Sequence, residues 1–111
     1  MTTAETVLNE VNALKPNGFS DRLADFLESI ELRIQQELLD EENPVYNPSL
    51  LSLNKPDDDV YYLFLFSIID FLNGEYGRYE NSFLQFESAW NKLSLKFAKT
   101  RKNQKRRINL W

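Results

Sequence analysis

Hydrophobic residues recur at helical spacing near the start of the chain. Thr2 and Glu5 have the spacing of a capping box, which favours a helix that begins at about residue 3. The apolar positions that follow lie three or four residues apart: Val7, Leu8, Val11 and Leu14. This pattern predicts a helix over residues 3–14, ended by Lys15-Pro16-Asn17-Gly18.

A second helix is predicted over residues 20–39. Ser20 is a suitable N-cap, and Asp21 places negative charge in the first helical turn. One apolar stripe then follows at spacings of three and four: Leu23, Phe26, Leu27, Ile30, Ile34 and Leu38. Residues 40–56 contain Pro44, Pro48 and Pro56, which a helix interior does not tolerate, so they predict a long loop.

The most hydrophobic segment of the chain is Val60 to Leu72. Its periodicity alone fits a helix or a strand. Its length, the preceding Asp57-Asp58-Asp59 and the closing Asn73-Gly74 all favour a helix. We therefore predict a helix over residues 57–73, apolar nearly all round and hence central to the fold.

The strongest periodic signal is an aromatic and apolar stripe in the last third of the chain. Its positions alternate steps of three and four: Tyr76, Tyr79, Phe83, Phe86, Trp90, Leu93 and Phe97. This pattern predicts a helix over residues 75–99. Amphipathic helices normally bury such a stripe, so core packing is favoured over a ligand-stacking surface. The predicted core residues are Tyr76, Tyr79, Phe83, Phe86, Trp90 and Phe97.

The four segments predict an all-α protein: a small four-helix bundle with a long loop before the third helix and an extended C-terminal arm. The chain has 111 residues, of which 42% are hydrophobic and 27% charged, as in one globular domain. We expect a helical domain over 1–99 and a basic arm over 100–111.

The chain contains no Cys and no His. Disulfides, thiolate or imidazole metal ligands, and a Ser-His-Asp triad are therefore excluded. A chain of this length is also marginal for a deep cavity, so we expect neither an enzyme nor a cofactor.

A few carboxylate groups remain as candidates for chemistry. Asp57-Asp58-Asp59 could bind a hard cation, and the pairs Asp70 with Glu75 and Glu28 with Glu31 could act in acid-base catalysis. A helix start for the first group and solvated side chains for the pairs are the favoured interpretations.

Charge is divided unevenly along the chain. Residues 1–90 hold all 17 acids and five bases, a net charge of −12, whereas the last 21 residues hold eight bases and no acid. This division predicts an acidic body with a basic arm directed at nucleic acid or an acidic protein. The arm lacks interleaved aromatic residues that would stack on bases, and it ends in Ile108, Leu110 and Trp111, as an anchor for a protein pocket would. A solubility tail is the remaining alternative.

The beginning of the sequence has no basic and apolar pattern typical of a secretory signal. We therefore expect a cytoplasmic protein. The longest apolar stretch, 60–72, is shorter than the roughly 20 residues that a membrane-spanning helix needs. No membrane association is expected.

Several short motifs lie along residues 7–97. They are Ala13-Leu14-Lys15-Pro16-Asn17 with Ser20, Phe26-Leu27, Arg33-Ile34 with Glu37, Tyr62-Leu63, Ile69-Asp70-Phe71, Asn73-Gly74-Glu75-Tyr76, Arg78-Tyr79, Asn81-Ser82, and Phe86 with Ala89. In these residues the chain resembles the small head-tail connector, or adaptor, proteins of tailed phages and prophages of Gram-positive bacteria. The most specific stretch is 70–82, and the resemblance does not extend beyond Lys99.

The resemblance implies a structural protein of the virion neck that is assembled in the host cytoplasm. Its expected partners are the portal protein, copies of itself in a ring of twelve, and a stopper or head-completion protein. Genomic DNA would pass through the ring without specific binding, in keeping with an acidic body. On this basis the expected portal-binding residues are Arg101, Lys102, Lys105, Arg106, Arg107, Ile108, Leu110 and Trp111. The alternative is a nucleic-acid-binding or protein-binding module that acts through the arm.

Overall fold

The computed structural model describes the backbone of residues 1–109 and the side chains of residues 1–100. This part of the chain contains four α-helices and no strand, and the chain is 69% helical. The helices are α1 (Ala4–Leu14), α2 (Ser20–Arg33) with its π-helical continuation η1 (Ile34–Leu38), α3 (Asp59–Leu72) and α4 (Tyr76–Asn109). The predicted all-α, four-helix fold is confirmed.

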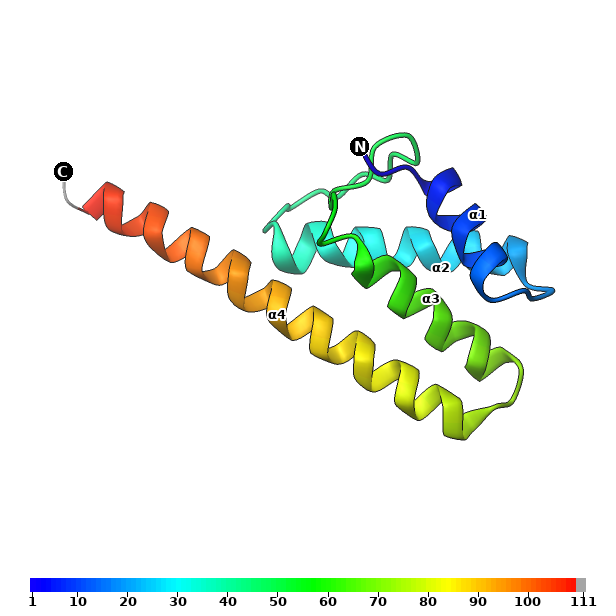
Figure 1. Cartoon of the computed structure of the whole chain (residues 1–111). Coiled ribbons are helices and arrows are strands. Elements are labelled where there is room, and N and C mark those ends of the chain that lie inside the picture. Colours follow the sequence, from blue (N-terminus) through cyan, green and yellow to red (C-terminus); the bar gives the residue numbers. More distant parts are fainter. Residues whose placement is uncertain (110–111) are drawn as a thin grey trace.

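Helix α3 lies at the centre of the fold and contacts each of the other three α-helices. Helices α3 and α4 form an antiparallel hairpin, and α2 crosses α3 on the opposite side from α4 (Figure 1). Helix α1 covers the remaining side of the α2 and α3 pair. The C-terminal half of α4 runs past the body, away from the end where α1 lies (Figure 1).

The starts of α1 and α2 each lie close to the predicted position. The Thr3 hydroxyl, one residue after the expected cap, accepts a hydrogen bond from the backbone N–H of Thr6 at 3.2 Å. Ser20 is the first helical residue rather than the N-cap, which is Phe19 without a side-chain cap. The Phe19 N–H instead donates to the side-chain oxygen of Asn17 at 2.8 Å. The loop before α2 is therefore fixed by an Asn side chain.

The turn between α3 and α4 follows the predicted Asn73-Gly74 stop. Gly74 has a positive φ of 74°, a backbone conformation that suits glycine. Its N–H donates to the carbonyl of Phe71 at 3.0 Å, and the N–H of Glu75 donates to the carbonyl of Asp70 at 2.9 Å. These bonds satisfy carbonyls at the end of α3 and let α4 begin directly after it.

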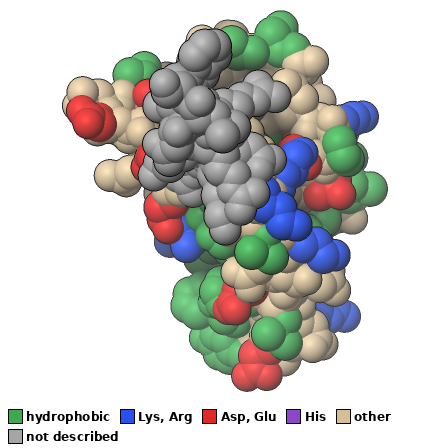
Figure 2. All heavy atoms as spheres, turned by 90° about the vertical axis from the view of Figure 1, so that its left-hand side faces the viewer, with side chains coloured by type: hydrophobic (Ala, Val, Ile, Leu, Met, Phe, Trp, Pro, Cys, Tyr) green, Lys and Arg blue, Asp and Glu red, His purple; other side chains and the backbone are tan. Residues whose placement is uncertain are grey.

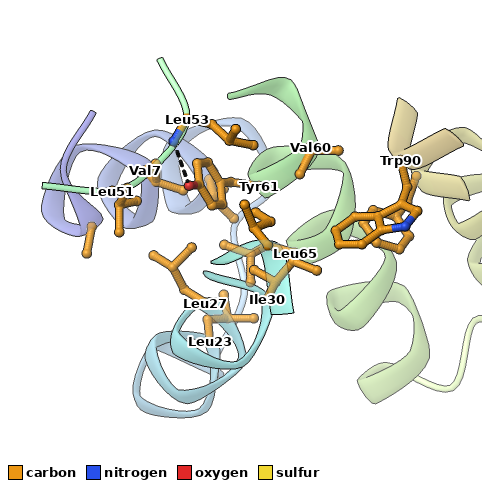
Figure 3. Close-up of a cluster of buried hydrophobic side chains, with 14 of the residues drawn as sticks. Val7, Leu23, Leu27, Ile30, Leu51, Leu53, Val60, Tyr61, Leu65 and Trp90 are labelled. Carbon is orange, nitrogen blue, oxygen red and sulfur yellow. Dashed lines mark hydrogen bonds between the residues drawn. The ribbon is translucent and has the colours of Figure 1, made fainter. Parts of the chain in front are cut away.

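The core lies where α1, α2 and the long loop meet α3 (Figure 3). Tyr61 and Leu65 of α3 are fully buried there. The other buried hydrophobic side chains are Ala4, Val7, Val11, Leu23, Leu27, Ile30, Ile34, Leu38, Leu51, Leu53, Val60, Ile69, Phe86, Trp90 and Leu93. Most of the stripes recognised in the sequence therefore contribute to one continuous core.

The loop between η1 and α3 packs closely against the body. Leu51 and Leu53 are buried in the core. The N–H of Ala4 donates to the carbonyl of Pro48 at 2.8 Å, and the N–H of Leu51 donates to the carbonyl of Thr2 at 2.9 Å. These contacts attach the middle of the loop to the N-terminal residues of the chain.

Helix α4 continues to Asn109, past its predicted end at residue 99. The prediction ended the helix where the apolar period stops. Residues 101–109 nevertheless contain no Gly or Pro, and most are Lys, Arg or Gln, which favour helix. Their positive charge also interacts favourably with the C-terminal end of a helix dipole. Backbone propensity therefore extends a helix that no longer has an apolar stripe.

Candidate functional site

Glu31 is a fully buried carboxylate at the centre of a hydrogen-bond cluster. The Tyr61 hydroxyl donates to its Oε1 at 2.6 Å, and the Ser52 hydroxyl donates to its Oε2 at 2.7 Å. The Gln35 amide donates to Oε2 at 2.7 Å, and the Ser52 N–H donates to the same carboxylate at 3.2 Å. The cluster joins α2, η1, the long loop and α3.

The Tyr61 hydroxyl links the cluster to the loop by a second bond. It accepts a hydrogen bond from the N–H of Leu53 at 3.2 Å (Figure 3). Burial and the hydrogen bond to Glu31 raise the pKa of Tyr61 far above its usual value, so the phenol stays protonated. Glu28, the residue paired with Glu31 in the sequence analysis, is exposed. The expectation that Glu31 is solvated is therefore wrong, and its role is to hold the loop.

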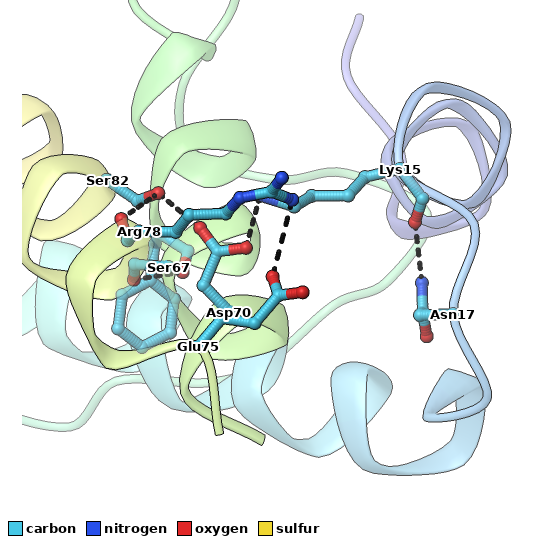
Figure 4. Close-up of polar contacts among 8 residues, drawn as sticks. Lys15, Asn17, Ser67, Asp70, Glu75, Arg78 and Ser82 are labelled. Atoms are coloured by element: carbon cyan, nitrogen blue, oxygen red, sulfur yellow. Dashed lines mark hydrogen bonds and ion pairs between the residues drawn. The ribbon is translucent and has the colours of Figure 1, made fainter. Parts of the chain in front are cut away.

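Asp70 is the second buried carboxylate and joins three helices (Figure 4). Its Oδ1 lies 2.5 Å from the Nζ of Lys15, which follows α1. Its Oδ2 accepts a hydrogen bond from the hydroxyl of Ser82 of α4 at 2.5 Å. Glu75, the proposed acid-base partner, is exposed and lies 3.4 Å from Arg78. The expectation that Asp70 is solvated is therefore also wrong.

Lys15, Asp70 and Ser82 each belong to a motif that carries the resemblance described above. Asn17, from the first of these motifs, donates a hydrogen bond to the carbonyl of Lys15 at 3.0 Å (Figure 4). Residues far apart in the sequence thus meet at one corner of the fold. The motif residues described here hold α1 and α4 against the end of α3.

The pKa of Asp70 reflects opposing effects. Burial raises the pKa, but the hydrogen bonds and positive charge of Lys15, together with the Ser82 hydroxyl and Arg78, bring it below its ordinary value. A carboxyl whose pKa is lower in the folded state stabilises the fold above its unfolded pKa. That contribution is lost as the pH falls through the folded pKa.

We expect Lys15→Met to lower the free energy of unfolding by about 2 kcal/mol at neutral pH, since it removes a charged partner from a buried carboxylate. Because the folded pKa of Asp70 lies below its ordinary value, the difference should persist at about pH 4 and shrink only as the pH falls further, through that lowered pKa. Urea unfolding followed by circular dichroism at several pH values measures this. Arg22→Met, a change at an exposed base, is the control. A difference that stays constant with pH would contradict the assigned role of the Lys15 pair.

The aromatic stripe of α4 lies against α3, and α4 also contacts η1. Phe86 and Trp90 are buried, and their ring centroids lie 6.0 Å apart. The guanidinium of Arg33 lies 4.3 Å from the centroid of the Trp90 ring. Tyr79, Phe83 and Phe97 are partly buried.

Tyr76 departs from this pattern. It is 61% exposed and meets the edge of the Phe71 ring at 5.9 Å, so its prediction as a core residue is wrong. It lies in the first turn of α4, where Phe71, its neighbour on α3, is itself exposed. The stripe in the sequence therefore begins at Tyr76, before the part of α4 whose side chains are buried against the body.

Basic residues gather on the C-terminal half of α4. Lys92, Lys96 and Lys99 are exposed, and Lys96 Nζ lies 2.6 Å from the Oδ2 of Asp57. Figure 2 shows Lys and Arg side chains beside the end from which α4 projects, with Asp and Glu side chains spread over the body. The predicted portal-binding side chains lie outside the described residues: Arg101, Lys102, Lys105, Arg106, Arg107, Ile108, Leu110 and Trp111.

Two open grooves flank the outer face of α3. The α3–α4 groove has a volume of about 640 Å³ and an apolar floor that includes Leu63, Ala89 and Leu93. The α1–α3 groove has a volume of about 550 Å³. It is lined by Glu10, Leu14, Lys55, Pro56, Asp58, Asp59, Tyr62, Leu63 and Phe66. Shallow grooves with apolar floors and charged rims suit protein contacts.

Within the described residues, no group of three or more acidic side chains is arranged to hold a metal ion. Asp57 pairs with Lys96, and the Asp58 carboxylate accepts a hydrogen bond from the Thr2 hydroxyl at 3.4 Å. No helix in this part of the chain is long and apolar enough to cross a membrane.

Comparison with protein-family models, curated proteins and solved structures gives no match for this chain. The candidate functional site is therefore described from the surface features of the chain alone. Its features are two grooves on α3, the exposed side chains of Leu14 and Leu84 in their linings, and a basic helix that projects from an acidic body.

Proposed function

We propose that the protein is a structural head-tail connector, one subunit of a ring beneath the portal of a tailed phage. The observation that carries the proposal is the projection of the basic end of α4 beyond a body of opposite charge. The motifs that resemble connector proteins support it. Copies of the chain form the ring, expected to have twelve subunits, in the neck of the virion.

The charge distribution suits a channel for DNA. An acidic body repels the phosphates of a duplex that has to slide, so DNA passes without specific binding. The basic end of α4 reaches the portal above, and a stopper or head-completion protein binds below. The protein acts by assembly alone and catalyses no reaction.

A nucleic-acid-binding or protein-binding module is the second candidate. The eight bases and the absence of acids in the last 21 residues favour it. A module of this kind would bind duplex DNA as an isolated protein, with an affinity that falls steeply as salt is added. The two functions therefore differ in what the basic segment binds.

We expect deletion of residues 108–111 to weaken portal binding about tenfold or more at every salt concentration. The deletion removes Trp111, whose burial in a portal pocket would slow dissociation. Replacing Arg101, Lys102, Lys105, Arg106 and Arg107 by Gln should weaken binding mainly at low salt, where charges steer association. Titration of each variant with purified portal across a salt series measures both effects. Replacing the exposed body base Arg22 by Gln is the control.

Duplex binding by the free protein, measured in the same buffers, separates the two functions. If the tip deletion still binds portal normally while loss of the bases abolishes tight duplex binding, the segment serves DNA and its role as the portal anchor is wrong. If the native chain binds duplex DNA tightly but does not bind portal, the connector proposal fails. An image reconstruction of the particle neck with this chain between portal and stopper would establish its place.

A further inference from the structure

The face of α4 that is turned away from the body is both apolar and basic over residues 92–99. Leu95 is 64% exposed although it lies in a helix whose other large apolar side chains mostly face α3. Lys92, Ala98 and Lys99 lie three or four residues from Leu95, on the same side of the helix, and all three are exposed. We call Lys92, Leu95, Ala98 and Lys99 the outer face of α4.

The α1–α3 groove has the complementary character. Leu14, Leu63 and Phe66 give it an apolar lining, and Leu14 is 71% exposed. Glu10, Asp58 and Asp59 supply three carboxylates to its wall against the single base Lys55. The groove therefore offers apolar surface and excess negative charge.

The walls of this groove are held in place. The Tyr62 hydroxyl donates to Glu10 Oε2 at 2.6 Å and so joins α3 to α1. At the end of α1, the Nζ of Lys15 lies 5.7 Å from the centroid of the Phe66 ring and also pairs with Asp70. A groove held by such contacts meets a partner without first having to be ordered.

The outer face of α4 cannot fill the α1–α3 groove of its own chain. Leu93 and Phe97, on the other side of α4, contact the core. Leu95 therefore points away from the body. The C-terminal half of α4 and helix α1 also lie at opposite ends of the molecule (Figure 1). In the described part of the chain, this face therefore cannot meet its own groove, whereas the groove of a second copy is open to it.

We propose that the outer face of α4 of one copy docks into the α1–α3 groove of a second copy. Leu95 packs against Leu14, and Lys92 and Lys99 face the carboxylates of Glu10 and Asp59. Because the groove and the helix face are different surfaces, a docked pair keeps one free groove on one copy and one free helix face on the other. Further copies can therefore add from head to tail. The contact rests on the exposed leucines and the complementary charge; its closure into a ring rests on the proposed function.

Site-specific crosslinking tests the contact even where it is weak. The chain has no Cys, so Leu14→Cys and Leu95→Cys each introduce a unique thiol. A mixture of these two full-length variants, treated with a short bismaleimide, should give a crosslinked dimer. Leu84→Cys replaces Leu95→Cys in the control, since Leu84 is 62% exposed on the same helix but lies about 16 Å away. The control mixture should give at least tenfold less dimer.

A second experiment uses the difference between the two surfaces. Leu14→Asp disables the groove and Leu95→Asp disables the helix face, and both leucines are exposed enough for the fold to survive. Each variant alone should self-associate at least tenfold more weakly than the native chain in sedimentation velocity. Their mixture should form a one-to-one dimer and nothing larger, because one intact groove and one intact helix remain. Circular dichroism and thermal unfolding confirm that both variants are folded.

Three outcomes would overturn the proposed contact. One is an equal crosslink yield from the Leu84→Cys control. Another is a mixture of the Asp variants that stays monomeric while the native chain associates. The third is absence of both a native self-association and a Leu14-to-Leu95 crosslink. If the crosslink fails while the protein still binds portal, the contact is wrong and the connector function stands. If the crosslink forms but portal binding is absent, the subunit contact stands and the connector function is wrong.

Discussion

Phe86→Ala is expected to lower the free energy of unfolding by about 3–5 kcal/mol, which is a large part of the stability of a small domain. Phe86 is 2% exposed, and its ring lies within 5.2 Å of Phe64, 5.9 Å of Phe83 and 6.0 Å of Trp90, measured between centroids. Truncation leaves a cavity at the α3–α4 contact. Urea unfolding followed by far-ultraviolet circular dichroism measures the change.

Other aromatic residues of α4 provide a graded control. Tyr76→Ala, at an exposed position of the same helix, should change the free energy of unfolding by about 0.5 kcal/mol. Phe83→Ala should lie between the two, because its side chain is partly buried. Equal losses for Tyr76→Ala and Phe86→Ala would contradict the assignment of Phe86 to the core.

The sequence was sufficient to predict the number and order of the helices, because each helix carries its own apolar stripe and end signals. The long hydrophobic run and the Asn73-Gly74 pair after it identified α3 and its end, whereas the antiparallel packing of α3 and α4 came from the structure (Figure 1). The end of α4 was mispredicted, since a helix can continue on propensity after its apolar stripe ends. Tyr76 was misassigned because periodicity shows which side of a helix is apolar, and not how far its partner extends.

The two buried carboxylates were not predictable from spacing. Glu31 is satisfied by Ser52 and Tyr61, which lie 21 and 30 residues further along the chain. Asp70 is satisfied by Lys15, which comes from a different helix end. Local sequence gives no sign of such partners, and a carboxylate on a helix is normally solvated. The α1–α3 groove was missed for the same reason, because its walls are brought together only by the fold.

The Glu31 and Asp70 clusters lie beside the elements that form the α1–α3 groove, the proposed subunit contact. The Asp70 cluster fixes α1 against α3 beside the groove, and the Glu31 cluster fixes the loop that leads into the start of α3. A shallow docking surface on a small domain depends on such internal contacts, since every wall that moves adds an entropic cost to binding. The buried carboxylates Glu31 and Asp70 thus help to hold the apolar lining of the α1–α3 groove in position.

Glu31→Ala is expected to lower the free energy of unfolding by about 3 kcal/mol or more, because it leaves one buried donor and several partly buried donors without an acceptor. The Ser52 N–H and hydroxyl lose their partner, as does the Tyr61 hydroxyl. The loop should open more often than the rest of the fold. Native-state hydrogen exchange should show loss of protection at the amides of Ser52 and Leu53, while amides within α3 follow the global stability.

Glu28→Ala is the matched control for this effect, because Glu28 lies one turn earlier on α2 and is exposed. It should change the free energy of unfolding by about 0.5 kcal/mol or less. Tyr61→Phe keeps the ring but removes the hydroxyl, so it should cost about 1–3 kcal/mol and deprotect Leu53 more than Ser52. Protection at Ser52 that survives Glu31→Ala would show that the carboxylate does not hold the loop. Equal effects of the Glu28 and Glu31 substitutions would lead to the same conclusion.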